Sequence, residues 1–313
     1  MSFSVEARKE AARVPCEKRC CALAELSGAA LGSGALTFKG PGRYALSLSV
    51  GGAFAAERYL RLFKRFLHCD CLMAAVKSSR LGGQVRYEVS PPENELPRVL
   101  KALKLLDKDQ PFGMRSVPAP ELIQGECCKQ AFLRGLFLAG GSTGDPRRSY
   151  HFEIAVGDEA LAACTEAVLL SFGLPARRVQ RKAQWVVYLK DGEHMATALA
   201  LIGAHQAMLQ LENVRIVKDL RNEANRQANC DSANVDKALA AAEQQLSVIE
   251  VIDRQLGVEA LPEPLRDVAE LRVRFPDASL AELGGMLTPA LGKSGVKARM
   301  RKLEALAEEL VNG

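Results

Sequence analysis

The chain has 313 residues, of which 48% are hydrophobic and 25% are charged, and its formal net charge is +5. This length favours two domains over one, and the composition is typical of globular proteins that bury proper cores. The mild excess of basic residues permits an acidic partner such as nucleic acid without requiring one.

The first 15 residues form a charged helical pattern without the apolar segment of a secretory signal, and no apolar run approaches the 18 or more residues of a membrane span. The nine cysteines are an odd number, and we expect free thiols in a reduced, cytoplasmic protein. Cys16, Cys20 and Cys21 are conceivable metal ligands, but no second C-x-x-C or Cys/His pair completes a four-ligand set. The sequence therefore predicts no metal and no other cofactor.

The first 212 residues are predicted to contain two copies of one unit, at about 16–110 and 122–212. The residues that recur 107 positions later are Cys20-Cys21 as Cys127-Cys128, Gly28 as Gly135, and Gly34 as Gly141. The offset falls to 106 between residues 44–50 and 150–156, and to 101 further on. These length changes coincide with expected loops, where they cost little. We call residues 1–212 the repeat domain.

Each copy is predicted to run helix, strand, helix, hairpin, helix. The corresponding ranges are 20–34, 43–50, 53–66, 71–89 and 94–106 in the first copy, and 127–141, 150–156, 159–172, 175–189 and 192–205 in the second. The strands alternate apolar and polar residues, and Gly82-Gly83 marks one hairpin turn. Two αββαββα-like halves with antiparallel sheets give an α+β fold class.

The first helix of each copy carries small residues four positions apart. These are Gly28 and Gly32 in the first copy, and Gly135 and Ala139 in the second. Such spacing places them on one helix face and lets two backbones approach closely. We expect the two helices to pack against each other.

These helices resemble the LAGLIDADG helices of homing endonucleases, with the nine positions at residues 26–34 and 133–141. The resemblance implies a pseudo-dimer in which an acid at the eighth position binds a divalent metal. That position is Ser33 in one copy and Gly140 in the other. Because Mg²⁺ requires anionic oxygen ligands, the sequence predicts that the protein binds DNA without cutting it.

Residues 213–258 are predicted to form a helical linker that is rich in Asn and Arg near its start, with a helix over 235–256 and Gly257 as its stop. Residues 259–313 are predicted to form an all-α helix-turn-helix domain. There, Ser279 and Glu282 form a capping box, and Ser294 is a candidate N-cap for the last helix.

The last helix is predicted to separate apolar from basic residues. Val296, Met300 and Leu303 fall on one face, which predicts a core. The candidate DNA-binding residues on the other side and its flank are Lys293, Ser294, Lys297, Arg299, Arg301 and Lys302. The charge lies at the N-terminal end, where recognition helices contact base edges and phosphates.

The chain as a whole resembles the WhiA family through "FLRGLFLAGGS", "NRQANCDSANVDKA", "LPEPLRDVAELR", "SLAELGGML" and "KSGVKARMRKL". The resemblance implies a non-catalytic, sequence-specific DNA-binding regulator of transcription in cell division, chromosome segregation or sporulation, associated with the nucleoid. Lys297-Ala298 stands where the family typically has Asn-His, which removes two side chains suited to base recognition.

Two other functions remain open from the residues alone. One is a residual metal-dependent DNA endonuclease, and the other is a scaffold whose repeat domain binds a protein partner in transcription or division. The repeat domain has one strongly basic strand, with Arg177, Arg178, Arg181 and Lys182 as candidate contacts to double-stranded DNA. We expect no membrane partner.

Overall fold

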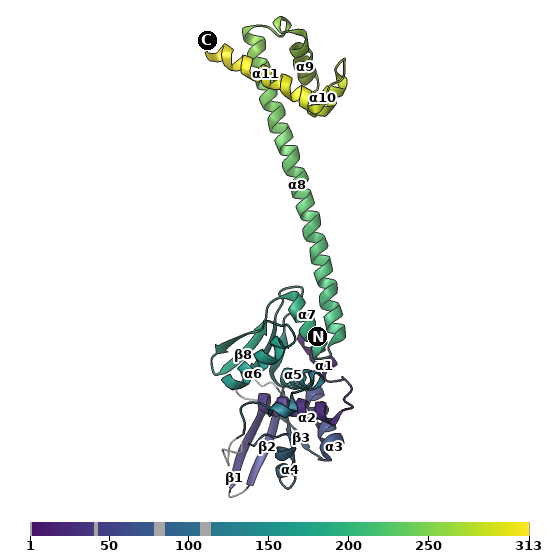
Figure 1. Cartoon of the computed structure of the whole chain (residues 1–313), viewed down its shortest axis with the longest axis vertical. Helices are drawn as coiled ribbons and strands as arrows, with labels where there is room; N and C mark the ends of the chain where they lie inside the picture. The colour runs from purple at the N-terminus through teal and green to yellow at the C-terminus, as the bar shows by residue number, and fades with distance from the viewer. Residues whose placement is uncertain (1, 41–42, 78–84, 107–113, 313) are drawn as a thin grey trace. The chain divides into compact units, whose positions relative to one another are not determined.

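The computed structural model describes residues 2–40, 43–77, 85–106 and 114–312. The chain divides into two compact units, Met1–Lys218 and Asp219–Gly313 (Figure 1). One long helix, α8 (His205–Gln255), begins in the first unit and ends in the second. The predicted linker at residues 213–258 thus falls almost entirely within a single helix that starts eight residues earlier than that linker.

The first unit opens with α1 (Phe3–Ala11) and then holds the first copy. The elements of that copy are α2 (Arg19–Ser33), β1 (Gly34–Gly40), β2 (Arg43–Val50), α3 (Ala53–Leu67), β3 (Leu72–Lys77), β4 (Val85–Ser90) and α4 (Leu96–Ala102). The strands form an antiparallel sheet in the order β1-β2-β4-β3.

The second copy follows a short 3-10 helix at Pro120–Leu122 and repeats the same plan. Its elements are α5 (Glu126–Gly140), β5 (Gly141–Thr143), β6 (Phe152–Val156), α6 (Glu159–Leu170), β7 (Arg177–Arg181), β8 (Gln184–Leu189) and α7 (Gly192–Leu201). Its antiparallel sheet has the matching order β5-β6-β8-β7. The predicted α+β class with two related halves is therefore confirmed.

The core of the first unit lies between the sheets and the helices. Alternate residues of β2 and β6, such as Leu48 and Ile154, are fully buried because the period of a strand places them on one face. Phe137 of α5 stacks on Phe152 of β6 with ring centroids 5.1 Å apart. The apolar alternation in the sequence therefore identified the buried face of each sheet.

Some sequence-based boundaries differ from the structure. The strands β1 and β5 lie outside the predicted strands, although residues 36–39 of β1 alternate apolar and polar side chains; β5, with three residues, is too short to show a pattern. The predicted helix over residues 192–205 is interrupted at Gly203, whose φ of 84° belongs to the left-handed region that favours glycine. The turn at Gly82-Gly83 lies outside the described residues.

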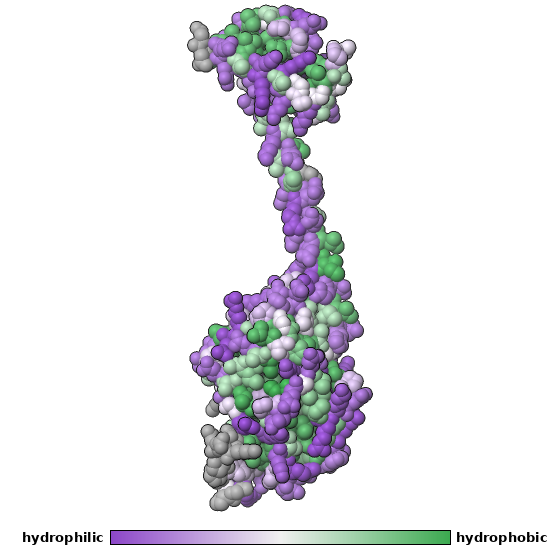
Figure 2. Space-filling model, viewed as in Figure 1, coloured by the Kyte–Doolittle hydropathy of each residue, from purple (hydrophilic) through white to green (hydrophobic). Residues whose placement is uncertain are grey.

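The start of α8 is fixed by the first helix of the chain. The Glu10 carboxylate accepts hydrogen bonds from the backbone N–H groups of Gln206 and Ala207, at 2.6 and 3.1 Å. These are two of the donors that a helix leaves unpaired at its N-terminus. Beyond the first unit, residues 221–230 and 232–241 of α8 are exposed, and this stretch carries mostly hydrophilic side chains (Figure 2).

The second unit contains the end of α8, a 3-10 turn at Val258–Ala260, α9 (Glu263–Arg274), α10 (Leu280–Met286) and α11 (Lys293–Asn312). Gly257 ends α8 with a φ of 80°, as its sequence position predicted. A shared core joins these helices, and its buried members include Ile252, Val268 and Leu283. Among the described residues, we find no helix that is both long and apolar enough to span a membrane.

Candidate nucleic-acid interface

Helix α11 separates buried from exposed residues as the helical wheel predicted. Val296, Met300 and Leu303 are at most 2% exposed and lie in the core of the second unit. The side chains of Lys293, Ser294, Lys297, Arg301 and Lys302 are exposed on the other side of the helix. Four cations therefore stand in solvent at the N-terminal half of a helix whose opposite face is fixed by packing.

The position of α11 is set by α10 and the loop that follows it. The capping box is present: Ser279 accepts a hydrogen bond from the N–H of Glu282, and the Glu282 carboxylate accepts one from the N–H of Ser279 at 2.8 Å. A Cβ atom at Gly284 would lie 2.0 Å from the carbonyl oxygen of Leu291. Only glycine lets this loop come so close to α10, and the loop leads directly into α11.

Two details of α11 differ from the sequence-based expectation. The N–H of Val296 donates to the carbonyl of Gly292, so the helix begins at Lys293 and Ser294 lies in its first turn. The prediction that Ser294 caps the helix is therefore wrong. Arg299 is half-buried, and its guanidinium donates to the carbonyl oxygen of Pro264 at 3.1 Å, so this side chain also fastens α11 to the start of α9.

The basic strand of the repeat domain, β7, is the edge strand of the second sheet and is exposed along its whole length. Arg178 forms an ion pair with Glu166 at 3.2 Å, and Arg181 forms one with Glu153 at 3.1 Å. Lys182 stands in the tight turn after the strand with a φ of 55°. Together with Arg177, these are the cations on which DNA contact by this domain would depend.

The two helices α2 and α5 touch each other at their glycines. A Cβ atom at Gly135 would lie 2.1 Å from the carbonyl oxygen of Glu25, and one at Gly28 would lie 2.5 Å from that of Phe132. At Gly32 the neighbours are more tolerant, with the end of the Leu136 side chain at 3.0 Å. Glycine is required at the crossing because the backbones themselves meet there.

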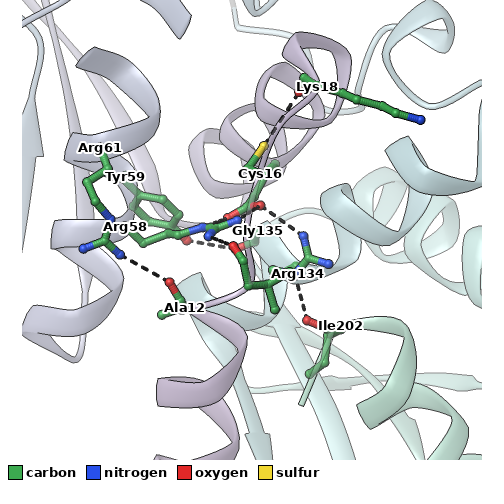
Figure 3. Close-up of polar contacts among 11 residues, drawn as sticks. Ala12, Cys16, Lys18, Arg58, Tyr59, Arg61, Arg134, Gly135 and Ile202 are labelled. Atoms are coloured by element: carbon green, nitrogen blue, oxygen red, sulfur yellow. Dashed lines mark hydrogen bonds and ion pairs between the residues drawn. The ribbon is translucent and has the colours of Figure 1, made fainter. Parts of the chain in front are cut away.

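A buried carboxylate sits beside this crossing. Glu25 is fully buried and receives two hydrogen bonds from Arg58, at 2.7 and 2.8 Å, and one from Arg134 at 3.3 Å. Figure 3 shows Arg58 and Arg134 meeting at this point, with Tyr59 donating to the carbonyl of Gly135 at 3.0 Å. Arg58 and Arg134 come from different copies, so the network ties the copies together.

The positions that match the metal-binding acids of homing endonucleases lie at the C-terminal ends of α2 and α5. The Ser33 hydroxyl donates to the carbonyl oxygen of Ala29 at 3.0 Å, within its own helix. A Cβ atom at Gly140 would lie 2.5 Å from the carbonyl oxygen of Ala155. No side chain larger than hydrogen fits at position 140 unless the neighbouring strand moves.

Other acids near the helices are already engaged. Glu25 is held by two arginines, as described above, and an oxygen of Asp145 accepts the N–H of Arg147 at 2.9 Å. Glu153 on the outer face of the second sheet accepts from Ser142 at 2.9 Å and contacts His151 at 2.7 Å. Each of these carboxylates therefore already has a hydrogen-bond partner within the protein.

The structure overturns one premise of the sequence analysis, that no second pair completes a set of four metal ligands. The sulfur atoms of Cys20, Cys21, Cys127 and Cys128 all lie within 4.8 Å of one another. A hydrogen bond from Cys21 lowers the pKa of Cys127, whereas burial raises the pKa of Cys21 and, to about 12, that of Cys128. The cysteines are free, as expected, but their clustering was not predicted.

Three family models match the chain in succession. The model of the WhiA N-terminal LAGLIDADG-like domain covers residues 19–106, that of the WhiA LAGLIDADG-like domain covers residues 129–221, and that of the WhiA C-terminal HTH domain covers residues 224–307. The chain belongs to the WhiA family. The resemblance inferred from short motifs is thereby confirmed over almost the whole length.

Relatives within the WhiA family cover nearly the full chain. A protein of Heliobacterium modesticaldum named "probable cell division protein WhiA" is 42% identical over 309 residues, which is 98% of this chain and 96% of the relative. One of the same name from Desulfitobacterium hafniense is 42% identical over 315 residues, or 99% and 96% of the two chains. The crystal structure of full-length WhiA from Thermatoga maritima matches with a TM-score of 0.62 and 26% identity over 99% of both chains.

These comparisons define the architecture of the chain. A LAGLIDADG-like domain formed by two copies precedes a helix-turn-helix domain, as in the WhiA family. A crystal structure of the isolated N-terminal LAGLIDADG domain of WhiA also matches, with a TM-score of 0.51 over 64% of this chain. The match to the helix-turn-helix domain ends at residue 307, so it includes the N-terminal half of α11 and the exposed cations there.

Proposed function

We propose that this protein is a sequence-specific regulator of transcription that binds double-stranded DNA without cleaving it. It acts with the nucleoid in the cytoplasm, in cell division, chromosome segregation or sporulation. The relatives named as probable cell division proteins support the cellular role. The DNA-binding role is supported most directly by α11, where exposed Lys297, Arg301 and Lys302 stand opposite a buried apolar face.

The buried and the exposed face of α11 have different roles. Met300 and Leu303 anchor it in the core, so Arg301 and Lys302 are projected outward from a rigid support. Arginine can donate two hydrogen bonds to a guanine edge in the major groove. A lysine such as Lys302 neutralises a phosphate, which positions the protein without reading the sequence.

The C-terminal ends of α2 and α5 lack the side chains that cleavage would need. Ser33 supplies a neutral hydroxyl that already bonds to its own helix, and Gly140 supplies no side chain. Phosphodiester cleavage with metal ions needs anionic ligands at the scissile phosphate. The buried Glu25 faces two arginines, which outbalance its charge and leave it unsuited to hold a cation.

The test begins with selection of bound fragments from a bacterial genomic library by the full-length protein. Affinities for a selected duplex and a scrambled one are then measured at several salt concentrations. Arg301→Ala should weaken the selected site by about 1–3 kcal/mol and the scrambled one much less. Lys302→Ala should weaken both alike and reduce the slope of log affinity against log salt by about one.

Arg254→Ala provides the matched control. Arg254 is an exposed cation of the same unit, paired with Glu250 within α8, and its removal changes the net charge equally. This variant should bind as the wild type does. If Arg301→Ala and Lys302→Ala also bind the selected site as the wild type does, α11 is not the recognition helix, and β7 becomes the surface to test.

A further inference from the structure

Four cysteine sulfurs converge at the N-terminal ends of the paired helices α2 and α5. Cys20 and Cys21 occupy the second and third positions of α2, and Cys127 and Cys128 occupy the same positions of α5. Their sulfur atoms lie within 4.8 Å of one another. Cys128 is buried, Cys21 is half-buried, and Cys20 and Cys127 are exposed, so the cluster is anchored on one side and open to solvent on the other.

The convergence follows from how the helices pack. The backbones of α2 and α5 meet at Gly28 and Gly135, and each glycine lies the same number of residues after its cysteine pair. The crossing therefore brings equivalent first turns together from the two copies. Because helical backbones carry all four cysteines, the sulfurs are held near one another before any ligand binds.

The spacing suits one ion better than a disulfide pair or an iron–sulfur cluster. A tetrahedral zinc ion with sulfurs at about 2.3 Å places them about 3.8 Å apart, and the observed limit of 4.8 Å is close to that spacing. A cluster with several irons would hold the sulfurs farther apart. A disulfide would need two sulfurs at about 2.05 Å.

The surroundings also suit thiolate ligands. Neither α2 nor α5 has a side-chain hydrogen bond at its N-cap, residues Lys18 and Gly125, and all four cysteines lie in the first turn of their helix. Two helix N-termini place partial positive charge beside the sulfurs, which stabilises the negative charge of a metal–thiolate centre.

We propose that Cys20, Cys21, Cys127 and Cys128 bind a single zinc-class divalent ion that fastens the two copies of the repeat domain together. Binding replaces the thiol protons with four sulfur–metal bonds and releases those protons to solvent, with no change of oxidation state. Four protein ligands leave no open coordination position, which is the arrangement of structural zinc sites.

The ion would have no part in DNA cleavage. Ser33 lies 13 residues beyond Cys20 on α2, which corresponds to about 20 Å along the helix axis. The cysteine cluster and the positions that match the nuclease acids thus occupy opposite ends of the same helix pair. A metal ion at these cysteines would act on the assembly of the repeat domain, whether or not α11 binds DNA.

The experiment uses full-length protein purified without a metal-binding tag under reducing conditions. Its metal content is measured, the metal is removed, and the metal-free protein is titrated with Co²⁺ alone and then with Zn²⁺. One cobalt ion per chain should bind with the intense sulfur-to-cobalt charge-transfer and ligand-field absorption of a tetrahedral thiolate site, and zinc should displace it. Zinc should also raise the unfolding temperature of the repeat domain, followed by the fluorescence of Trp185.

Cys20→Ser and Cys127→Ser, which alter exposed ligands, should each lower the affinity for cobalt at least tenfold and weaken the charge-transfer absorption. Cys230→Ser removes an exposed thiol of α8 and should change neither. Native Trp185 fluorescence in the serine variants would show that the fold is retained.

Three results would overturn the proposal. The first is that the reduced wild-type protein binds no cobalt or zinc at one equivalent. The second is that protein alkylated inside cells yields peptides joined by disulfides between the two cysteine pairs. The third is acid-labile sulfide in the purified protein, which would show an iron–sulfur cluster.

Discussion

Replacing Gly135 with alanine tests the helix pair on which the repeat domain is built. The added Cβ atom would lie 2.1 Å from the carbonyl oxygen of Glu25 and 3.1 Å from the backbone nitrogen of Ala29, and both atoms belong to helix α2. Backbone cannot rotate away as a side chain can, so the helices must separate by about 1 Å to restore ordinary contact. The same shift would disturb the hydrogen bond from Tyr59 to the carbonyl of Gly135.

We expect Gly135→Ala to destabilise the repeat domain by about 1–3 kcal/mol or more, the usual cost of overpacking a core. Alanine is intrinsically better than glycine in a helix by about 1 kcal/mol, so a net loss would reveal the clash against an opposing effect. For a domain of this size, each kcal/mol corresponds to a fall in the unfolding temperature of about 2–4 °C.

The assay is thermal and urea unfolding followed by tryptophan fluorescence. The sequence has one tryptophan, Trp185, and it lies in β8, so the signal reports the repeat domain alone. Gly157→Ala is the control, because a Cβ atom there would meet nothing within 4 Å. Gly32→Ala, which meets the flexible end of Leu136, should fall between the two. If Gly135→Ala unfolds at the same temperature and the same urea concentration as Gly157→Ala, the close contact between the helices does not exist.

Three further perturbations test other parts of the molecule. Glu25→Gln should cost about 3–5 kcal/mol in urea unfolding, because it leaves the buried guanidinium of Arg58 without its counter-charge; a loss below 1 kcal/mol would contradict the buried network. The wild type should not cut bound plasmid DNA with Mg²⁺ or Mn²⁺. The double variant Ser33→Asp/Gly140→Asp should not cut it either, since an aspartate at position 140 collides with β6. Site-specific cutting that persists on re-purification would refute this. Ser279→Ala should cost about 1 kcal/mol and speed amide exchange in residues 280–286 about fivefold, while unchanged exchange would show that the capping box adds no stability.

Much of the fold could be predicted because its determinants are local. The helix predicted at residues 20–34 spans Arg19–Ser33, and the capping box of Ser279 and Glu282 forms as expected. The start of α8 at His205 was not predicted, because the hydrogen bonds from Gln206 and Ala207 to Glu10 that fix it join residues far apart in the sequence. Intrinsic propensity alone carries no information about such a tertiary cap.

The cysteine cluster was not predicted, although the sequence contains the information that locates it. Cys20-Cys21 and Cys127-Cys128 are distant in sequence, and their proximity arises only when the two helices cross. The shared offset of 107 residues between the cysteine pairs and between Gly28 and Gly135 contained this information. A prediction that the helices pack at their glycines implies that residues at equal distances before those glycines also meet.

The helix pair also explains how a nuclease-like scaffold remains stable without the acids at its C-terminal ends. The residues that join α2 and α5 are the crossing glycines and the Glu25 network, in the middle of the helices. Ser33 bonds within its own helix, and Gly140 packs against β6, so neither contributes to the contact between the helices. Two carboxylates held together at those ends would repel each other unless a cation lay between them. A helix pair without carboxylates at these ends needs no cation there to offset such repulsion.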